Sequence, residues 1–346
     1  MERALRVAVA GASGIGKHHA KWFHRAGAQV VGFLGRSRES AAATERVLRD
    51  IFPFSGQGYW DLDQLLSEEA PDVVDVCLPN EAHFDCVKCA LERGCHALCE
   101  KPLVWHSDGP KQTQMQARAL VDLARQTNLH LGVCTQYAAA LPNYRRLYEE
   151  ARGSLTTIES FYAEMETLAR GRRRSAAEVW IDMASHPLSM LLAWMPDGVI
   201  EPASLQVVSG SGEVQACFSF ADSSGSCRCE IIVRDLHAGQ PLRRFGVNGF
   251  LVDCTGQPAS DGTYCSVLST GESELIGDDF MSLLIAQFAA AAIQPELTPL
   301  VSGEVGLRNL ELQYKFCRIP KCGSRSQRLS VTITEFDLLG RQLKER

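Results

Sequence analysis

Three titratable side chains in this chain of 346 residues have the types and settings that proton-transfer chemistry needs. Lys101 stands between Glu100 and Pro102 after an apolar segment, and Asp182 and His186 are four residues apart. A lysine that ends a buried strand is partly desolvated, so it can donate a proton or stabilise negative charge. On one helix Asp182 and His186 would share a face, where the carboxylate orients the imidazole and raises its basicity. We expect all three to be catalytic; a surface turn and a helix-surface ion pair are the alternatives.

A glycine-rich segment near the N-terminus has the pattern of a phosphate-binding turn. The apolar residues 5–10 precede Gly11-Ala12-Ser13-Gly14-Ile15-Gly16, and a helical pattern follows. A strand, a glycine turn and a helix N-terminus bind a pyrophosphate, because the free N–H groups and the helix dipole favour an anion. The G-x-G-x-x-G template is imperfectly matched, since Ser13 replaces the middle glycine. We expect cofactor contacts from Gly11, Ser13, Gly14, Ile15 and Gly16; a turn in a cofactor-free domain is the alternative.

Strand and helix patterns alternate up to about residue 135, which is typical of a parallel sheet covered by helices. Such a sheet binds its ligand beyond the carboxyl ends of its strands. Four segments follow predicted strands: 11–16, 35–37, 79–83 and 100–102. We therefore expect further cofactor contacts from Leu78, Pro79, Asn80, His83, Glu100 and Lys101.

The residues after the second predicted strand bear on the choice between NAD and NADP. A fold that prefers NAD places an acid there for the ribose hydroxyls, but this chain has Gly35, Arg36 and Ser37. Arg36 can pair with a 2′-phosphate or stack on adenine, and Ser37 can donate a hydrogen bond to it. We therefore predict NADP as the cofactor, with NAD possible; a solvated loop charge at Arg36 is the alternative.

The second half of the chain has closely spaced strand patterns separated by Gly, Ser and Asp turns. Strands are predicted at 155–167, 203–209, 214–221, 227–234, 243–253 and 329–333, and helices at 143–151, 181–195, 278–293 and 302–317. Strands without intervening helices favour a mostly antiparallel sheet. We predict an α/β chain, with a doubly wound Rossmann domain in residues 1–136 and an α+β domain in 137–346.

Composition limits the partners. The net charge of −6 and the lack of a long basic run argue against nucleic acid as the main partner. The densest basic cluster, Arg170 with Arg172, Arg173 and Arg174, is interpreted as a solvated loop, with an anion contact as the alternative. No apolar stretch reaches membrane-spanning length, and a predicted strand begins almost at once, so we expect no membrane partner and a cytoplasmic location.

The chain has 13 cysteines, which in a reducing compartment are expected to be small buried hydrophobes. Cys86 and Cys89 form a C-x-x-C pattern near Cys95 and Cys99, which raises the possibility of a metal site. Cys86 and Cys89 fall in a predicted helix and Cys99 in the following strand, so four thiolates would have to converge across two elements. We therefore predict no metal site.

Taken together, these motifs resemble the glucose–fructose oxidoreductase / inositol dehydrogenase (Gfo/Idh/MocA) family. The motifs that carry the resemblance are the glycine turn followed by His19, Leu78-Pro79-Asn80-x-x-His83, Glu100-Lys101-Pro102 and Asp182-x-x-x-His186. The resemblance implies an N-terminal Rossmann domain and a C-terminal domain with a large open sheet. It also implies a homodimer or homotetramer that uses this sheet.

The resemblance implies hydride transfer between nicotinamide and a hydroxyl-bearing carbon of a sugar, cyclitol or diol. His186 would be the acid/base, Lys101 would hold the developing alkoxide, and Asp182 would be the partner of His186 or a substrate ligand. Trp180 departs from the family pattern before the aspartate, so we expect it to narrow or reshape the pocket. The segment 104–114 also looks elongated, close to the expected site.

Two other functions remain open from the sequence alone. One is reduction of an imine or of an unsaturated, bilin-like ligand on a related fold. The other is a catalytically idle regulatory protein that binds a dinucleotide or a sugar. Such a protein is expected to have lost Lys101 or His186, and both are present here.

Overall fold

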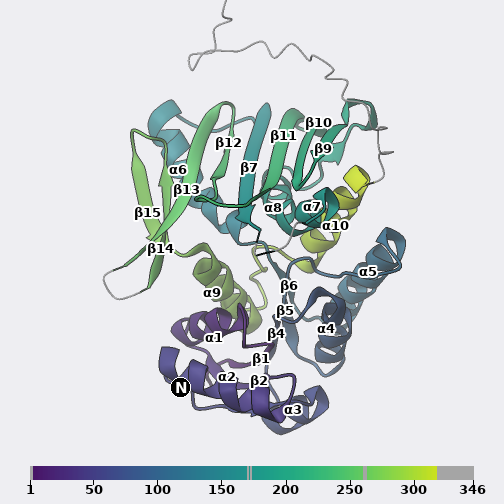
Figure 1. The fold of residues 1–346 in the computed structure, drawn as a ribbon, viewed down its shortest axis with the longest axis vertical. Coiled ribbons are helices and arrows are strands. Elements are labelled where there is room, and N and C mark those ends of the chain that lie inside the picture. The colour runs from purple at the N-terminus through teal and green to yellow at the C-terminus, as the bar shows by residue number, and fades with distance from the viewer. Residues whose placement is uncertain (1–2, 170, 172–173, 260–262, 318–346) are drawn as a thin grey trace, which may run out of the picture.

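A computed structural model describes residues 3–169, 171, 174–259 and 263–317 of the chain. It contains two β-sheets, one parallel and one mostly antiparallel, which lie at opposite ends of the molecule with helices between them (Figure 1). This agrees with the predicted fold class. The division at residue 136 stays a prediction.

The first sheet has six parallel strands in the order β3-β2-β1-β4-β5-β6, which is the Rossmann order. All of the strands but β3 are buried along most of their length, as expected for a sheet that is covered on both faces. The strands are β1 Arg6–Ala10, β2 Gln29–Leu34, β3 Gln57–Tyr59, β4 Val73–Val76, β5 His96–Glu100 and β6 Leu131–Cys134.

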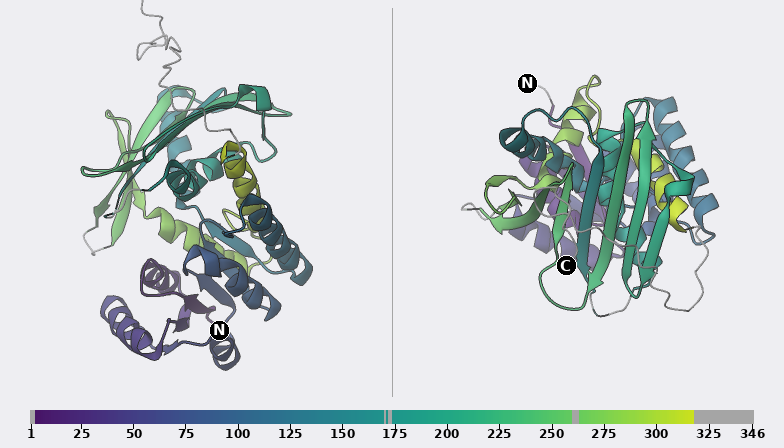
Figure 2. Two further views of the ribbon diagram at one scale, coloured as in Figure 1. Left: turned by 45° about the vertical axis from the view of Figure 1, so that its right-hand side comes forward. Right: turned by 90° about the horizontal axis from the view of Figure 1, so that it is seen from above.

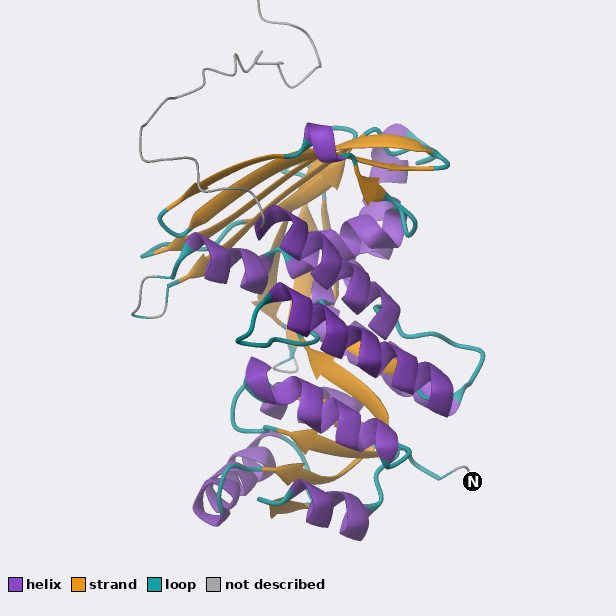
Figure 3. Cartoon of the chain, turned by 90° about the vertical axis from the view of Figure 1, so that its right-hand side faces the viewer, coloured by secondary structure: helices purple, strands orange, loops and turns teal. Residues whose placement is uncertain are grey.

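Helices connect these strands and cover the sheet on both sides (Figure 3). They are α1 Gly16–Arg25, α2 Arg38–Ile51, α3 Leu62–Glu69, α4 His83–Glu92 and α5 Pro110–Thr127. Local sequence sets several of their ends. The side chains of Ser37 and Asp61 cap α2 and α3, Pro110 begins α5, and Asn128 ends α5 in the left-handed conformation.

The second sheet has nine strands in the order β15-β14-β13-β12-β7-β11-β10-β8, with β9 paired to β10. All its pairings are antiparallel except that between β7 and β11. The strands are β7 Ser160–Leu168, β8 Val199–Ile200, β9 Gln206–Gly210, β10 Glu213–Asp222, β11 Gly225–Leu236, β12 Arg243–Val247, β13 Phe250–Pro258, β14 Tyr264–Ser269 and β15 Glu274–Asp278.

The prediction of one strand over 243–253 was wrong. The structure has two antiparallel strands, β12 and β13, joined at Asn248 and Gly249. Both residues have positive φ, at 51° and 72°, which is the conformation of a tight hairpin turn. The Asn-Gly pair was the available signal. The strand predicted at 329–333 lies outside the described residues.

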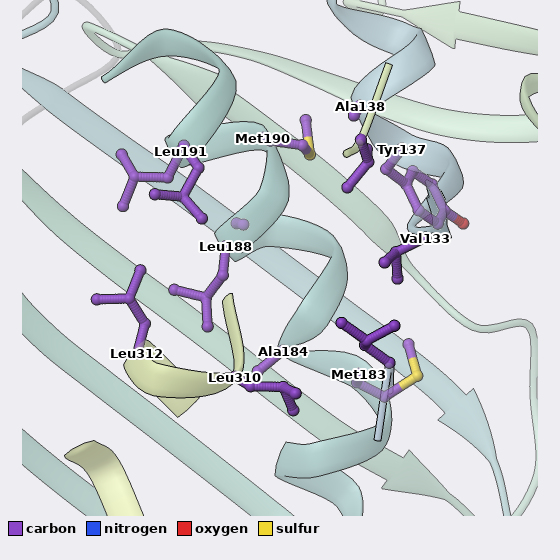
Figure 4. Close-up of a cluster of buried hydrophobic side chains, with 14 of the residues drawn as sticks. Val133, Tyr137, Ala138, Met183, Ala184, Leu188, Met190, Leu191, Leu310 and Leu312 are labelled. Atoms are coloured by element: carbon purple, nitrogen blue, oxygen red, sulfur yellow. The ribbon is translucent and has the colours of Figure 1, made fainter. Parts of the chain in front are cut away.

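Helices cover only one face of the nine-stranded sheet (Figure 2). They are α6 Leu141–Arg152, α7 Ala176–Met183, α8 Ser185–Trp194 and α10 Gly303–Cys317. Helix α8 is buried along nearly its whole length, and its Leu188 and Leu191 lie close to Leu310 and Leu312 of α10 (Figure 4). This apolar packing fixes α8, which carries His186.

Helix α9, Phe280–Ile293, returns to the first half of the chain and packs against α1. Its Leu284, Ile285 and Phe288 share a buried cluster with Val7 and Phe23. Helices late in the chain therefore complete the core around the first sheet. Three short 3₁₀ helices lie at Asn80–Ala82, Gln136–Ala140 and Pro202–Ser204. Within the described ranges, no helix is both long and apolar enough to cross a membrane.

Candidate active site

The glycine turn lies between β1 and α1, and two of its glycines are required by packing. Gly11 has a φ of +95°, and a Cβ there would be 2.6 Å from the carbonyl oxygen of Cys77. A Cβ on Gly16 would be 2.6 Å from the carbonyl oxygen of Gly11. By contrast, a Cβ on Gly14 would meet nothing within 4 Å. The turn therefore packs closely against the residue after β4 at Gly11, and it is open at Gly14.

The start of α1 has no side-chain cap, because Ile15 stands at the N-cap. Ser13, Gly14 and Ile15 are exposed, so the first N–H groups of the helix face open space. Free N–H groups at the positive end of a helix dipole bind phosphate well. The turn thus fits a pyrophosphate, and all five predicted turn residues lie here.

The end of β2 has no acidic residue at 35–37, as the sequence shows. Arg36 is exposed there, while Ser37 caps α2, with its hydroxyl 3.3 Å from the backbone nitrogen of Ser40. The nitrogen of Gly35 donates to the carbonyl oxygen of Tyr59 over 2.7 Å, which fixes the turn. Arg36 is therefore the charged group available to a ligand at this strand end.

The predicted role of His83 needs correction. Its side chain is fully buried, and both ring nitrogens are close to backbone carbonyl oxygens. Nδ1 lies 2.9 Å from the oxygen of Pro102, and Nε2 lies 2.8 Å from the oxygen of Leu78. His83 therefore joins the end of β4 to the Glu-Lys-Pro turn and leaves no nitrogen for a cofactor. Leu78 and Asn80 are partly buried and Pro79 is exposed, beside the glycine turn.

A buried cluster of charged groups joins α1, β4 and β5. His19 is completely buried, and its Nδ1 lies 3.0 Å from Oδ2 of Asp75. Its Nε2 lies 3.2 Å from Oε1 of Glu100. Burial alone would lower the pKa of His19, but the two carboxylates outweigh it and raise the pKa to about 10. His19 is therefore a cation that connects the glycine-turn helix to the residue before Lys101.

Glu100 also contacts the backbone of the next residue. Its Oε2 accepts a hydrogen bond from the nitrogen of Lys101 over 3.2 Å. Burial acts to raise the pKa of Glu100, but the bond and charge of His19 and the charge of Lys101 leave it below its usual value. Glu100 is thus an ionised group that orients the turn, and the structure shows it bound to protein groups.

Lys101 and Asp182 meet between the two halves of the molecule. The ammonium of Lys101 donates to Oδ1 of Asp182, and also to its backbone oxygen over 3.1 Å. Burial acts to raise the pKa of Asp182, but Lys101 and Arg174 lower it to about 2. The two residues predicted to be catalytic from distant segments therefore form an ion pair.

Arg174 is a residue of this site that the sequence did not reveal. Its Nη1 donates to Oδ2 of Asp182 over 2.6 Å, and its Nε donates to Oδ2 of Asp235 over 2.8 Å. A second guanidinium nitrogen binds Oδ1 of Asp235, so the Arg174–Asp235 pair is bidentate. The interpretation of Arg174 as a solvated loop residue was wrong. Arg170, Arg172 and Arg173 lie outside the described residues.

Asp182 and His186 do not share one helix face, so the predicted pair needs correction. Helix α7 ends at Met183 and α8 begins at Ser185, with Ala184 between them. The carboxylate of Asp182 is directed to Lys101 and Arg174 instead. Pro187 in the first turn of α8 was a signal of a new helix, because proline is tolerated there and not in a helix interior.

His186 lies at the start of α8 with an exposed fraction of 8%. Its Nδ1 is buried without a hydrogen-bond partner among the described residues, and its ring lies 5.1 Å from that of Tyr137, edge to face. Burial, and then the charge of Lys101, lower the pKa of His186 to about 3. The imidazole is therefore neutral at physiological pH.

The expectation that Trp180 reshapes the pocket was wrong. Trp180 is only 2% exposed and packs on Phe316 at 4.6 Å between ring centroids. Its Nε1 donates to the backbone oxygen of Gln313 over 3.2 Å. Trp180 is a core residue of α7 that packs on α10.

A small cavity lies behind Lys101 and is lined by the polar side chains of Thr135, Ser185, Asn309 and Gln313. Asn309 donates to the backbone oxygen of Ser185 over 2.7 Å, and Gln313 donates to Asn309 over 2.7 Å. These bonds hold the first turn of α8 against α10. They fix the position of His186 from the side opposite Tyr137.

Comparison with known proteins identifies the first half of the chain. Residues 5–135 match the Gfo/Idh/MocA family model, described as an oxidoreductase family with an NAD-binding Rossmann fold. This part of the chain is therefore similar to the Rossmann domain of the Gfo/Idh/MocA family. The match covers β1 to β6, including the glycine turn and the Glu-Lys-Pro segment.

Two curated relatives that match about half of this chain are named dehydrogenases of sugar derivatives. D-Glucoside 3-dehydrogenase of Escherichia coli is 32% identical over 180 residues, which are 51% of this chain and 46% of that protein. UDP-N-acetylglucosamine 3-dehydrogenase of Acidithiobacillus ferrooxidans is 28% identical over 190 residues, 54% of this chain and 53% of that protein. The matches thus span about half the length of these relatives.

A solved structure resembles the whole fold. An inositol dehydrogenase homologue of Azotobacter vinelandii, complexed with NADH and myo-inositol, has a TM-score of 0.66. The similarity covers 91% of this chain and 95% of that one, at 16% sequence identity. It shows that both halves of the chain have the architecture of that protein.

Proposed function

We propose that the protein is an NAD(P)-dependent oxidoreductase that transfers a hydride between nicotinamide and a hydroxyl-bearing carbon of a sugar, cyclitol or diol. The observation that carries this proposal is His186, a buried neutral imidazole near the Lys101–Asp182 ion pair. The family match over residues 5–135 and the names of the curated relatives support it.

The residues divide the proton chemistry between them. In the oxidation direction the neutral imidazole of His186 accepts the substrate hydroxyl proton, and in the reduction direction its imidazolium returns it. The ammonium of Lys101 stabilises the negative charge that develops on the substrate oxygen. Asp182, held between Lys101 and Arg174, keeps the ammonium in place. A bound nicotinamide supplies the hydride acceptor or donor.

The glycine turn and the end of β2 support NADP as the cofactor. The open space at Gly14 and the uncapped start of α1 suit the pyrophosphate. Arg36 is exposed where a 2′-phosphate would lie, and no carboxylate at 35–37 repels it. We therefore assign the cofactor contacts to the turn residues Gly11 to Gly16, to Arg36 and Ser37, and to Leu78, Pro79 and Asn80.

A substrate screen tests the activity. Purified protein is mixed with NADP⁺ or NAD⁺ and a panel of sugars, inositols and diols, and the absorbance of the reduced cofactor is followed. We expect turnover of at least one polyhydroxylated compound. Tight cofactor binding without turnover of any compound, in either direction, would instead favour a regulatory protein.

A cofactor titration tests the preference. NADPH should bind more tightly than NADH, and Arg36→Gln should reduce the ratio of the two affinities about tenfold, since it removes a charged hydrogen bond. Arg38→Gln is the matched control, because Arg38 lies over the Trp60 ring at 6.0 Å. Equal binding of both cofactors by the unmodified protein would refute the argument from Arg36.

We also propose that a homodimer or homotetramer forms through the outer face of the nine-stranded sheet. Among the residues that the structure describes, no helix covers that face (Figure 2). Light scattering at several protein concentrations measures the mass directly. A monomer at every concentration would contradict this assembly.

A further inference from the structure

Arg243 is the first residue of β12, and the pairing of this strand shows which way its side chain points. Arg243 is opposite Met165 on β7, whereas the next residue, Arg244, is opposite Glu164. Successive strand residues face opposite sides of a sheet, so Arg243 shares its side with Met165 and Phe245, which are fully buried. Arg243 therefore points to the helix-covered side, where the site lies.

The guanidinium of Arg243 is near the rings of Tyr137, in the 3₁₀ helix Gln136–Ala140, and of His186, at the start of α8. Burial raises the pKa of Tyr137 to about 12, and a hydrogen bond and the charge of Arg243 act in the opposite direction. The Tyr137 ring in turn lies 5.1 Å from that of His186, and the charge of Arg243 also acts on His186. Arg243, Tyr137 and His186 therefore form one cluster.

Arg243 differs from three other partly buried arginines near this sheet, because each of those three is bound to a carboxylate. Arg174 binds Asp235, Arg234 binds Glu164 and Glu166, and Arg244 binds Asp253. The side chain of Arg243 donates to the backbone oxygen of Leu242 over 3.0 Å. No carboxylate of the described residues lies within ion-pair distance of it.

Each of the other cations named at this site is paired with a carboxylate. Lys101 and Arg174 share Asp182, Arg174 also has Asp235, and Glu100 faces His19. Arg243 is thus the cation near His186 whose charge the described protein groups leave uncompensated. A partly buried guanidinium has most of its five donors free and matches the planar fork of a carboxylate or the oxygens of a phosphate.

We propose that Arg243 binds an anionic group of the substrate, so that the enzyme acts on an acidic sugar derivative, a sugar carboxylate or a sugar phosphate. This rests on the proposed function. The anion would pair with Arg243 while a hydroxyl of the same molecule reaches His186 and Lys101. Arg243 is a specificity-determining residue in this proposal and takes no part in proton transfer.

Kinetics with matched compounds test the proposal. Hexoses and inositols are compared with hexuronates, aldonates and hexose phosphates of the same stereochemistry, with NADP⁺ or NAD⁺. We expect the highest kcat/KM for an acidic compound. Arg243→Gln should raise its KM about 30-fold or more with kcat changed only a few-fold, and should leave the KM of its neutral counterpart within about twofold. The carboxylate and phosphate compounds distinguish the two sources of charge.

Two further variants make this test specific. Arg243→Lys keeps the charge and should recover part of the affinity for the acidic compound. Arg244→Gln is the matched control, because the Arg244 side chain binds Asp253 over 2.6 Å on the opposite face of the sheet. The ratio of the KM of the acidic compound to the KM of its neutral counterpart should not change in this variant.

The inference is overturned if the enzyme prefers neutral compounds, or if Arg243→Gln affects acidic and neutral compounds equally. Either result leaves the proposed function intact. If no compound is turned over, the proposed function itself is overturned. In that case calorimetry tests the anion site, by measuring whether glucuronate or glucose 6-phosphate binds to the complex of the protein with its cofactor. Arg243-dependent binding of either compound supports the anion site, and no binding overturns it.

Discussion

Two of the buried histidines, His19 and His186, have pKa values that are shifted in opposite directions. His19, in the Rossmann half, is 0% exposed and has a pKa raised to about 10. His186, at the start of α8, is 8% exposed and has a pKa lowered to about 3. Burial acts in the same direction on both, because it penalises the charged imidazolium. The neighbours therefore decide the difference.

Two carboxylates face His19, whereas an ammonium is near His186. Asp75 and Glu100 keep His19 charged, so it serves as a fixed cation that joins α1, β4 and β5. Lys101 opposes protonation of His186, so that imidazole stays neutral. One residue type thus performs a structural role at one site and supports a chemical role at the other.

Replacement of His186 should have the largest effect on activity. His186→Gln removes the proton acceptor, and turnover should fall about 10²–10⁴-fold, the usual contribution of a general acid/base. Cofactor binding and the thermal midpoint should change little, since no hydrogen bond of the His186 ring is seen among the described residues. Steady-state kinetics and cofactor titration measure both quantities.

Lys101→Met serves as the companion variant for that measurement. It should also reduce turnover, and it should raise the pKa of His186 by removing a nearby charge. If His186→Gln and Lys101→Met both keep normal turnover, the assigned roles are refuted. If His186→Gln mainly lowers stability, His186 belongs with His19 as a structural residue.

Replacement of His19 should have the largest effect on stability. His19→Gln leaves Asp75 buried without its cation, and breaking such a buried pair costs about 3–5 kcal/mol in the free energy of unfolding. Urea denaturation measures the loss. The control is His18→Gln, on the exposed neighbour in the same helix, which should stay within about 0.5 kcal/mol. Equal losses in the two variants would show that the buried pair contributes little.

The same cluster predicts how stability depends on pH. The pKa of His19 is higher in the folded state, about 10, than its ordinary value of 6.5. Its contribution is therefore fully present below pH 6.5 and is lost as pH rises to 10, by at most about 1.4 kcal/mol per unit. His19→Gln should lack this decline, which urea midpoints between pH 6.5 and pH 10 would reveal. A parallel decline in the variant would attribute it to other groups.

The comparison also explains what the sequence could reveal. The glycine turn, the alternating strands and helices, and the antiparallel spacing in the second half are local patterns, and they led to the correct fold class. Asp75 offers a further signal in the sequence, because it interrupts the apolar residues of β4. An acid in the middle of a buried strand indicates a buried partner, which is His19.

Other contacts had no signal in the sequence. Arg174 meets Asp235 because β7 and β11 are adjacent in the sheet, a pairing that chain order does not specify. Arg174 was therefore indistinguishable from a solvated loop residue. The absence of a carboxylate near Arg243 likewise depends on which strands face which helices. The sequence can therefore indicate which residues are functional, but the contacts that these residues make depend on the tertiary structure.

The smallest effect should come from Glu100, which stands between the two sites. Glu100→Gln keeps the shape of the side chain but removes one of the two negative charges that face His19. The folded pKa of His19 should fall while Asp75 keeps it above 6.5, so the alkaline loss of stability should begin at lower pH. At neutral pH the cost should be about 1–2 kcal/mol, less than for His19→Gln, because the Asp75 contact remains. If Glu100→Gln loses stability over the same alkaline pH range as the unmodified protein, Asp75 alone sets the pKa of His19. Glu100 would then act mainly through its bond to the Lys101 nitrogen, and its replacement should change the KM of the substrate more than stability.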